Sequence, residues 1–408
     1  MSVFVTDGEQ RATLALVRAL GRAGIPVTVG SATPSSLAGS SRFCEGRVHY
    51  PRPADQGEAF QSKVRNEMQS GNYRVLIPMT DITTILVAQI RKELEAFVRV
   101  PISTEEQIGR VRDKRQVLLE ARKIGIGCPE TFMLGDDQDL REISLKLPYP
   151  VVIKPRLSWI RRNGEWLSTS VEYACDAEDL KRKYQQAHSL VPDPLVQEHV
   201  RGEGRGVFLL VWNGELKAAF SHRRLREKPP WGGVSVYRES IPLDREMVDK
   251  SYQLLQAFGW QGPAMVEYKV DNRDGQLKLM EVNGRFWGSL QLALDSGMNF
   301  PLLYYRLAMG ENPASQFTYR AGARSRWLLG DLDQLLIRWK HRVGQNGLFA
   351  SEPSKLRASL DFLKFYEPNL RYEILRFEDP APGWCECRQY IRTLLHRSGS
   401  GKEGSRAH

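Results

Sequence analysis

Long apolar runs are missing from this 408-residue sequence. Without about 18 consecutive apolar residues, the chain has no candidate membrane-spanning helix. Its first residues, Met1 to Asp7, have a strand-like pattern and lack the charged start, apolar core and cleavage site of a signal peptide. We therefore expect a cytoplasmic protein with no membrane span.

Cysteine is also scarce, with five residues at irregular spacing and in an odd number, which argues against a disulfide framework. Cys385 and Cys387 have no second pair nearby, so their spacing does not indicate a zinc site. The remaining composition, 41% hydrophobic and 26% charged, is ordinary for a globular protein. The length is sufficient for two or three domains.

The sequence has fewer acidic than basic residues, and its formal net charge is +10. The basic residues are spread along the chain, with small groups at Arg161-Arg162 and at 223–228, and aromatic residues are not interleaved with them as in base-stacking platforms. We therefore expect no nucleic-acid partner. A basic cleft for anionic small molecules explains the same charge, and weak attraction to anionic membrane surfaces stays open.

The glycine fingerprint of dinucleotide-binding domains is absent after the first expected strand, where Asp7-Gly8-Glu9 stands instead. The chemistry of a nicotinamide cofactor is therefore not expected. The pattern nevertheless predicts a small, doubly wound parallel domain over residues 1–103. Its expected elements are strands at 3–6, 24–29, 73–78 and 97–102 and a helix at 12–23.

The rest of the chain continues with mixed helices and strands. A long helix is expected at 104–124, and a glycine-rich turn is expected at 201–206. The dipeptide Asn213-Gly214 predicts a hairpin. Further expected elements are strands at 149–154 and 195–200, a helix beginning near Ser289, and helical segments at 329–341, 355–365 and 386–396.

The most informative segment is a predicted hairpin at residues 265–285, with Asp274-Gly275 as its turn. Glu281 and Asn283 share a face of the second strand, because strand side chains alternate. An odd loop, such as residues 273–275, would place Glu267 opposite Glu281, and two facing carboxylates need a cation between them. Oxygen ligands suit Mg²⁺. An even loop would place the glutamates on opposite faces and remove this site.

Several segments occur in an order that resembles the ATP-grasp superfamily. They are Asp113-Lys114, Val151-Val-Ile-Lys-Pro155, Val196-Gln-Glu-His-Val200, Glu267, and Glu281-Val-Asn-Gly-Arg285. The similarity is greatest to the carboxylate–amine ligase branch, including D-aspartate ligase-like enzymes, whose synthetase domain is like that of carbamoyl-phosphate synthase large subunits. It covers about residues 1–310.

This resemblance implies a mixed α/β and α+β fold. An N-terminal Rossmann-like pre-ATP-grasp domain would occupy residues 1–103. The ATP-grasp domain would occupy 104–310, with a small lobe at 104–195 and a large lobe at 196–310. A helical C-terminal extension at 311–397 and a flexible tail at 398–408 would follow.

The resemblance also implies roles for individual residues, with ATP and Mg²⁺ as cofactors. Lys114 and Lys154 would contact the phosphates as point charges. Adenine would meet Gln197, Glu198 and the backbone near Val200, and Glu203 is a candidate for the ribose hydroxyls. The implied metal ligands are Glu267, Glu281 and Asn283, and the residues implied to assist phosphoryl transfer are Arg285 and Lys269.

One departure from the family pattern follows the strand that ends at Lys154. The glycine-rich loop that usually covers the phosphates has only Gly164 here. Arg161 and Arg162 are expected to cover the phosphates with side-chain charge in place of backbone N–H groups.

The implied reaction joins a carboxylate to an amine. The carboxylate attacks the γ-phosphate of ATP, and the amine then displaces phosphate from the acyl-phosphate, giving an amide. A bicarbonate-activating carboxylase and a nucleotide-binding regulator are the alternatives. A homodimer is possible.

Substrate contacts are the least determined part of the sequence. Arg223 and Arg224 lie on a basic strand and point to opposite faces, so one of them would suit a substrate carboxylate. Thr80 and Asp81 follow a strand of the first domain, at the edge of a parallel sheet where ligands bind. A solvated strand face and a helix cap are the respective alternatives.

Overall fold

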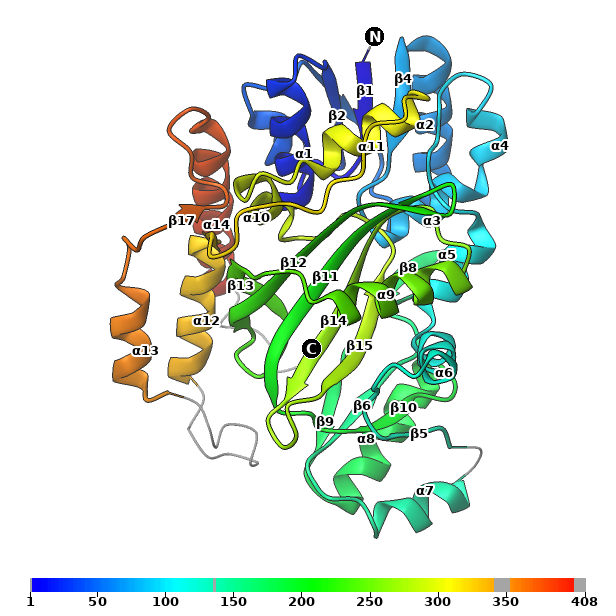
Figure 1. The fold of residues 1–408 in the computed structure, drawn as a ribbon, viewed down its shortest axis with the longest axis vertical. Coiled ribbons are helices and arrows are strands. Elements are labelled where there is room, and N and C mark those ends of the chain that lie inside the picture. The colour runs from blue at the N-terminus through cyan, green and yellow to red at the C-terminus, as the bar shows by residue number, and fades with distance from the viewer. Residues whose placement is uncertain (1, 135–136, 341–352, 400–408) are drawn as a thin grey trace.

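The computed structural model describes residues 2–134, 137–340 and 353–399 (Figure 1). Its strands form three larger sheets and one separate hairpin. Within those ranges, no helix combines the length and the apolar character needed to cross a membrane. The mixture of parallel and antiparallel sheets with helices confirms the expected fold class.

The first sheet has the order β3-β2-β1-β4, and all its pairings are parallel. Its central strand β1 (Ser2–Val5) is followed by α1 (Arg11–Arg22), whose apolar residues pack on the sheet. The expected strand at 97–102 is wrong, because only Arg99 forms a bridge, to Val75. The other elements are β2 (Val27–Ser31), β3 (Gly46–His49), β4 (Tyr73–Ile77), α2 (Gly57–Ser70), α3 (Asp81–Gln89) and α4 (Arg91–Leu94).

The prediction of a single helix at 104–124 is wrong, because this segment forms two helices, α5 (Glu105–Arg112) and α6 (Lys114–Ile124). Asp113 separates them with an extended backbone, and its side chain caps α6 by accepting a hydrogen bond from the N–H of Arg115. Cap formation is a strong preference of Asp at this position. The break places Lys114 at the first residue of α6.

The second sheet is antiparallel and has the order β5-β10-β6-β9. It carries the two expected strands, now bounded as β6 (Val151–Lys154) and β10 (Leu195–Glu198). A separate hairpin of β7 and β8 lies against the first domain, where the N–H of Trp166 donates to the carbonyl of Ala54. The remaining elements are β5 (Thr131–Phe132), β7 (Trp159–Arg162), β8 (Glu165–Ser168), β9 (Glu172–Ala174), α7 (Asp137–Ser144) and α8 (Ala177–Leu190).

The third sheet has seven strands in the order β15-β14-β11-β12-β13-β16-β17 (Figure 1). The hairpin at Asn213-Gly214 is confirmed, with both residues at positive φ. The glycine-rich turn at 201–206 is wrong, because that segment lies in strand β11. The elements are β11 (Gly202–Trp212), β12 (Glu215–Lys228), β13 (Val234–Ser240), β14 (Gly262–Asp271), β15 (Leu277–Asn283), β16 (Arg324–Arg326), β17 (Leu370–Tyr372), α9 (Arg245–Ala257), α10 (Leu290–Asp295) and α11 (Phe300–Ala308).

Both faces of the third sheet are buried along the middle of strand β11. Val207 and Leu209 belong to a core cluster with α9 and the first domain's outer helices. Phe208 and Leu210 point the other way, into a cluster with α1, α10 and α11. The alternation of a strand therefore joins the sheet to helices on both sides, and α10 and α11 lie between it and the first domain (Figure 1).

The C-terminal region contains the expected helices, now bounded as α12 (Leu328–Lys340), α13 (Lys355–Phe362) and α14 (Ala381–Gly399). The expected helical extension also contains two short strands, since β16 and β17 extend the third sheet beyond β13. Three-residue strands are too short to give a periodic signal. The expected tail at 398–408 begins inside α14, and residues 400–408 lie outside the described part of the chain.

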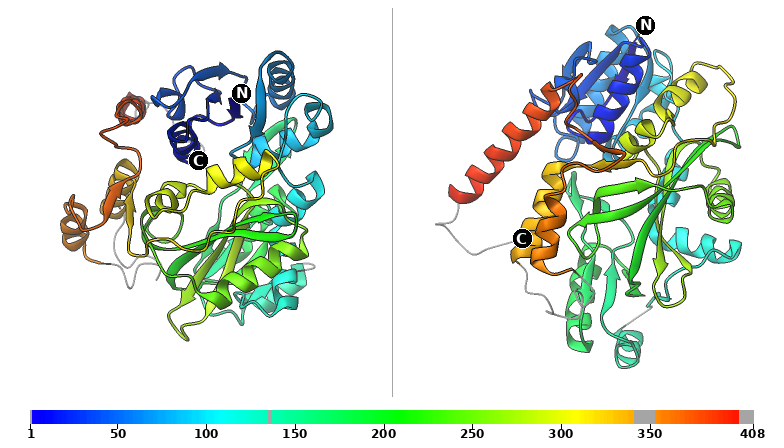
Figure 2. Two further views of the ribbon diagram at one scale, coloured as in Figure 1. Left: turned by 45° about the horizontal axis from the view of Figure 1, so that its top comes forward. Right: turned by 60° about the vertical axis from the view of Figure 1, so that its left-hand side comes forward.

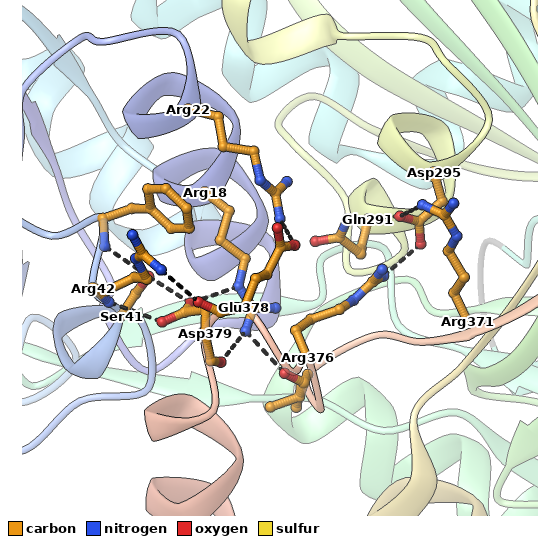
Figure 3. Close-up of polar contacts among 12 residues, drawn as sticks. Arg18, Arg22, Ser41, Arg42, Gln291, Asp295, Arg371, Arg376, Glu378 and Asp379 are labelled. Atoms are coloured by element: carbon orange, nitrogen blue, oxygen red, sulfur yellow. Dashed lines mark hydrogen bonds and ion pairs between the residues drawn. The ribbon is translucent and has the colours of Figure 1, made fainter.

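The segment between β17 and α14 is tied to the first domain by buried polar contacts (Figure 3). Asp379 accepts hydrogen bonds from Arg18 Nε at 2.8 Å, from Ser41 Oγ at 2.7 Å and from the N–H of Arg42 at 2.8 Å. Arg18 also donates to the carbonyls of residues 373, 374 and 379, and the side chains of Arg18 and Asp379 are fully buried. Arg376 pairs with Asp295 on α10. The C-terminal segment therefore joins the first domain to the third sheet.

Candidate active site

The candidate site is built on one row of residues across the third sheet. In register, His222 on β12 lies opposite Gly206 on β11, which lies opposite Glu267 on β14, which lies opposite Glu281 on β15. Residues that face each other in a sheet share a face. The row therefore places one imidazole and two carboxylates on the same side, with a glycine between them.

The glutamates face each other for a different reason from the one expected. The loop between the paired Asp271 and Gln276 has an even number of residues, 272–275, because the N–H of Asp271 donates to the carbonyl of Gln276. The register then shifts between residues 267 and 268, so that Met280 has no partner in the pairing. This bulge restores the facing of Glu267 and Glu281. The odd loop on which the expectation depended is therefore absent, whereas the expected facing of Glu267 and Glu281 is present.

Asn283 completes the acidic group. Its Nδ2 donates to Glu267 Oε1 at 3.3 Å and to Glu281 Oε1 at 3.1 Å. Burial raises the pKa of Glu267, whereas Lys114 and Lys154 outweigh burial at Glu281 and lower its pKa. The two carboxylates thus have different proton affinities even though they face each other.

Two buried lysines lie on the other side of Glu281. Lys114 Nζ is 4.0 Å from Glu281 Oε2 and donates to Ser158 Oγ at 2.7 Å. Lys154 Nζ donates at 3.0 Å to the carbonyl of Met280, the bulged residue. Burial lowers the pKa of Lys154 to about 8, against the opposing effect of Glu281. Both lysine side chains are less than a tenth exposed, so water screens their positive charges near Glu281 only weakly.

Arg285 lies beyond Asn283 and contacts the first domain. Its Nε donates to Asp81 Oδ2 at 3.1 Å, and its Nη2 donates to Asn283 Oδ1 at 3.4 Å. Asp81 is the first residue of α3, and Thr80 caps that helix by accepting from the N–H of Thr83. Thr80 therefore has the capping role, and it also lines the same cavity as Asp81 and Arg285.

Of the two candidate arginines on β12, only Arg224 faces the acidic group. Its Nη2 lies 2.5 Å from Glu267 Oε2, its Nη1 lies 3.0 Å from Glu227 Oε1, and its Nε has no hydrogen-bond partner. Arg223 instead pairs with Glu239 at 2.6 Å and with Glu203. Arg224 is thus the arginine available to an anion in the cavity.

Most of these groups line one cavity of about 1030 Å³ between the three sheets, whereas Lys114 is not part of its lining. Its size is at the upper end of ordinary ligand pockets, which suits a nucleotide together with a second substrate. Contributions come from the first domain, the second sheet and the third sheet. The lining includes Thr80, Asp81, Lys154, Gln197, Glu198, Val200, Arg224, Glu267, Lys269, Glu281, Asn283 and Arg285.

The strand end expected to hold adenine is mostly occupied by contacts within the protein. Gln197 Nε2 donates to Thr131 Oγ1 at 2.9 Å, and Glu198 accepts from the N–H of Glu130 and pairs with Arg273. Lys269 Nζ donates to the carbonyl of Val200 at 3.2 Å, and burial lowers the pKa of Lys269. The side chains of Gln197 and Glu198 and the carbonyl of Val200 therefore already have partners within the protein.

Five expected positions do not line the cavity: Lys114 and Arg223, described above, and Glu203, Arg161 and Arg162. Glu203 points toward Arg205 and Arg223 and is engaged in ion pairs with both. Arg161 and Arg162 lie on the β7–β8 hairpin, and Arg161 is 3.9 Å from Glu58 of the first domain. Neither arginine is part of the cavity lining, and their expected role over the phosphates stays a prediction.

The sequence analysis missed His222 and the reason for the glycines of β11. A Cβ at Gly206 would lie 2.9 Å from His222 Nε2, and a Cβ at Gly204 would lie 2.9 Å from Arg224 Cδ. The two glycines therefore make room for the side chains of β12 to lie across β11. Burial and the neighbouring arginines Arg224 and Arg238 lower the pKa of His222, which keeps its imidazole neutral. The alternating Gly-x-Gly of residues 204–206 was the signal available.

The donor set fits a hard cation. In the described residues, no group of three or more His, Cys, Asp and Glu side chains could hold a metal, and this includes Cys385 and Cys387. The site offers two carboxylates and one amide, whose oxygen and nitrogen are assigned from hydrogen bonds and can exchange by a flip. With that flip, all three ligands are oxygens, as Mg²⁺ prefers, and phosphate oxygens commonly complete such sites.

Comparison with known proteins agrees with this geometry. Residues 191–330 match a family model described as ATP-grasp in the biosynthetic pathway with Ter operon. The N-terminal section of the carbamoyl phosphate synthase large chain from Methanopyrus kandleri is 21% identical over 323 residues, which cover 74% of this chain and 55% of that protein. This chain thus spans about half the length of that curated relative.

Solved structures of low sequence identity share the fold. An L-amino acid ligase from Bacillus licheniformis is 18% identical with a TM-score of 0.59, covering 76% of this chain and 74% of that chain. The biotin carboxylase domain of 2-oxoglutarate carboxylase from Hydrogenobacter thermophilus, in complex with MgADP, ADP and bicarbonate, is 13% identical with a TM-score of 0.62, covering 79% and 73%. The resemblance to the ATP-grasp superfamily is therefore confirmed: this chain has the ATP-grasp fold, and its residues 191–330 carry the sequence signature of an ATP-grasp family.

Proposed function

We propose that this protein is an ATP-dependent ligase that activates a substrate carboxylate as an acyl-phosphate and joins it to an amine. The products are an amide, ADP and phosphate. We also propose the domain division 1–103, 104–310 and 311–397, with the active site between the first two parts. The solved structures of similar fold include an L-amino acid ligase and a biotin carboxylase domain, so the chemistry of the second substrate is part of the proposal.

One observation carries the proposal: Glu267, Glu281 and Asn283 converge within hydrogen-bonding distance in a large cavity, opposite Lys114 and Lys154. Partly buried carboxylates gathered at one point are costly unless cations neutralise them. Buried lysines beside them need anions in turn. A magnesium–triphosphate group satisfies both requirements, because it brings cation and phosphate together.

The chain's own residues have separable roles in this reaction. Lys114 and Lys154 hold phosphate oxygens by charge. Arg285, kept in place by Asp81, and Arg224, beside Glu267, present guanidinium groups to the place where a carboxylate must approach the γ-phosphate. When bound by Glu267, Glu281 and Asn283, Mg²⁺ would neutralise phosphate charge that otherwise repels the carboxylate.

The amine must reach the acyl group from the first-domain end of the cavity. That end is lined by Asp7, Glu9 and Asp81, three carboxylates suited to an ammonium group. Asp7 is buried, and its Oδ2 accepts from the hydroxyls of Thr6 and Thr83. Burial raises its pKa, so it is better placed than a solvated carboxylate to accept a proton from the attacking amine.

The test is ADP release from MgATP with and without pooled amino acids and small carboxylic acids. Release that needs the pool, yields an amide and is lost in Glu281→Gln supports the ligase. Release that needs only bicarbonate favours the carboxylase alternative. Binding of MgATP without turnover by any pool would favour a nucleotide-binding regulator, and absence of MgATP binding would refute the proposal.

A further inference from the structure

Helix α14 and the segment before it expose large apolar side chains. Phe377 is fully exposed, and Trp384, Ile391 and Leu395 are 73%, 55% and 66% exposed. Side chains of this size are usually covered, and a group of them on one surface marks an interaction site. We call Trp384, Arg388, Ile391, Arg392 and Leu395 the α14 outer face.

These residues recur with helical spacing. Trp384, Arg388, Ile391 and Leu395 are separated by four, three and four positions, and Arg392 follows Arg388 by four, so they form one stripe along the helix. The opposite side of α14 contacts the protein. Tyr390 donates to Asp333 Oδ1 at 2.7 Å, and Gln389 Nε2 donates to the carbonyl of Ser35 at 3.1 Å. The apolar stripe therefore points away from the core.

The charge of this face has one sign. Arg388 and Arg392 are exposed, and neither forms an ion pair with any residue that the structure describes. The one acidic residue of α14, Glu386, is on the inner side, where its carboxylate accepts a hydrogen bond from Trp327 Nε1. Glu378, just before the helix, is paired with Arg22. The outer face thus combines apolar and basic side chains without a free carboxylate.

The orientation of this face is fixed by the contacts at the start of α14. Asp379, two residues before the helix, is held by Arg18, Ser41 and Arg42, and Arg376 is held by Asp295 (Figure 3). Figure 2 shows α14 running along the side of the first domain with its length at the edge of the molecule. The helix cannot turn its stripe inward without breaking this buried cluster.

Charge decides which occupant fits. If a second copy covered the stripe by two-fold symmetry, α14 would pair with α14 about the middle of the stripe, and Arg388 and Arg392 of both copies would meet without a carboxylate between them. Like charges in that position are unfavourable. An anionic lipid surface instead matches both components, since arginine meets lipid phosphates and Trp, Ile and Leu enter the boundary of the acyl region.

We propose that the α14 outer face binds the surface of anionic membranes, so that the protein is peripherally associated with a lipid bilayer. This inference is independent of the ligase reaction, because none of these residues lines the cavity. The net charge of +10 on the whole chain adds a long-range attraction in the same direction.

The test is flotation of the full chain with vesicles of phosphatidylcholine alone and of phosphatidylcholine with phosphatidylglycerol. We expect binding to the anionic vesicles only, reversed by high salt. Arg388→Gln/Arg392→Gln should lower the partition coefficient about 30-fold, since each basic residue near an anionic leaflet strengthens binding about fivefold. Trp384→Ser/Ile391→Ser should abolish binding while leaving thermal stability unchanged, because both side chains are exposed.

A matched control changes an exposed apolar and an exposed basic residue elsewhere, Leu145→Ser/Arg245→Gln, and should bind like the unaltered protein. Failure of the unaltered protein to bind anionic vesicles would overturn the proposal. So would binding of both α14 variants that is as strong as binding of the unaltered protein. Light scattering adds a third outcome. A dimer that Trp384→Ser/Ile391→Ser dissociates would identify the face as an interface between copies and overturn the lipid assignment.

Discussion

The buried amine of Lys154 leads to a specific prediction about pH and nucleotide binding. Without ligand, burial holds its pKa at about 8, well below the ordinary value of 10.5. Phosphate oxygens next to Nζ favour the charged form, so the pKa of Lys154 must rise when MgATP binds. Binding is therefore accompanied by proton uptake above pH 8.

The magnitude follows from the two protonation states. With a pKa of about 8, roughly nine-tenths of the free protein carries the proton at pH 7 and roughly one-tenth at pH 9. If the bound protein keeps the proton throughout, the affinity for MgATP falls about tenfold between pH 7 and pH 9, equivalent to about 1.4 kcal/mol.

Calorimetric titration with MgATP at several pH values measures this effect. Two buffers with different enthalpies of ionisation are used at each pH, so that the number of protons taken up is obtained directly. Lys154→Arg keeps a positive charge at every pH and should bind with little pH dependence. Lys154→Met should bind weakly at pH 7 and also show little dependence.

Lys269 provides the control, because burial lowers its pKa as well. Lys269→Met should retain proton uptake by Lys154, whereas Lys154→Met should lose most of it. The reasoning is refuted if the unaltered protein takes up no proton at pH 8.5, or if Lys154→Arg shows the same tenfold loss between pH 7 and pH 9.

Three further predictions concern packing and buried charge, and the first has a matched control. Gly206→Ala introduces a Cβ that would lie 2.9 Å from His222 Nε2. We therefore expect it to lower the free energy of unfolding by about 1–3 kcal/mol and to weaken MgATP binding. In the control Gly109→Ala, no atom lies within 4 Å of the new Cβ, so this variant should be neutral or stabilising in thermal denaturation. Asp379→Asn leaves a buried guanidinium without its counter-charge and should cost about 3–5 kcal/mol in urea unfolding; an unchanged midpoint would contradict this. Burial raises the pKa of Glu386 from 4.5 to about 7, so the folded state loses stability as pH rises from 4.5 to 7. At pH 8, Glu386→Gln should therefore be more stable than the unaltered protein by up to about 3 kcal/mol. At pH 5 this difference should be absent.

The sequence alone was sufficient for the local features of the site. Glu281 and Asn283 share a face because strand side chains alternate, and this needs no tertiary information. Asn213-Gly214 predicts its turn from backbone preference alone. The order of Lys154, Glu267 and Glu281 along the chain was enough to indicate the superfamily, because order is a property of sequence.

Predictions from local sequence failed where contacts with distant residues determined the backbone conformation. Residues 201–206 contain three glycines and were expected to turn, yet residues 202–206 belong to β11 and pair with its neighbouring strands. Gly204 and Gly206 leave room there for Arg224 and His222. Asp113 was expected inside a helix, and it ends one helix and begins the next while pairing with Arg156. In both cases, partners distant in sequence decided the conformation.

The chain by itself thus determined which residue types are present for nucleotide chemistry and in what order they occur. Only the tertiary structure decided that Glu267 faces Glu281, because the bulge at Met280 compensates an even loop. It also decided that Arg224 rather than Arg223 enters the cavity, and that residues 370–379 hold the first domain against the third sheet. These outcomes depend on register and on long-range charge pairing, which periodicity along a single segment does not encode.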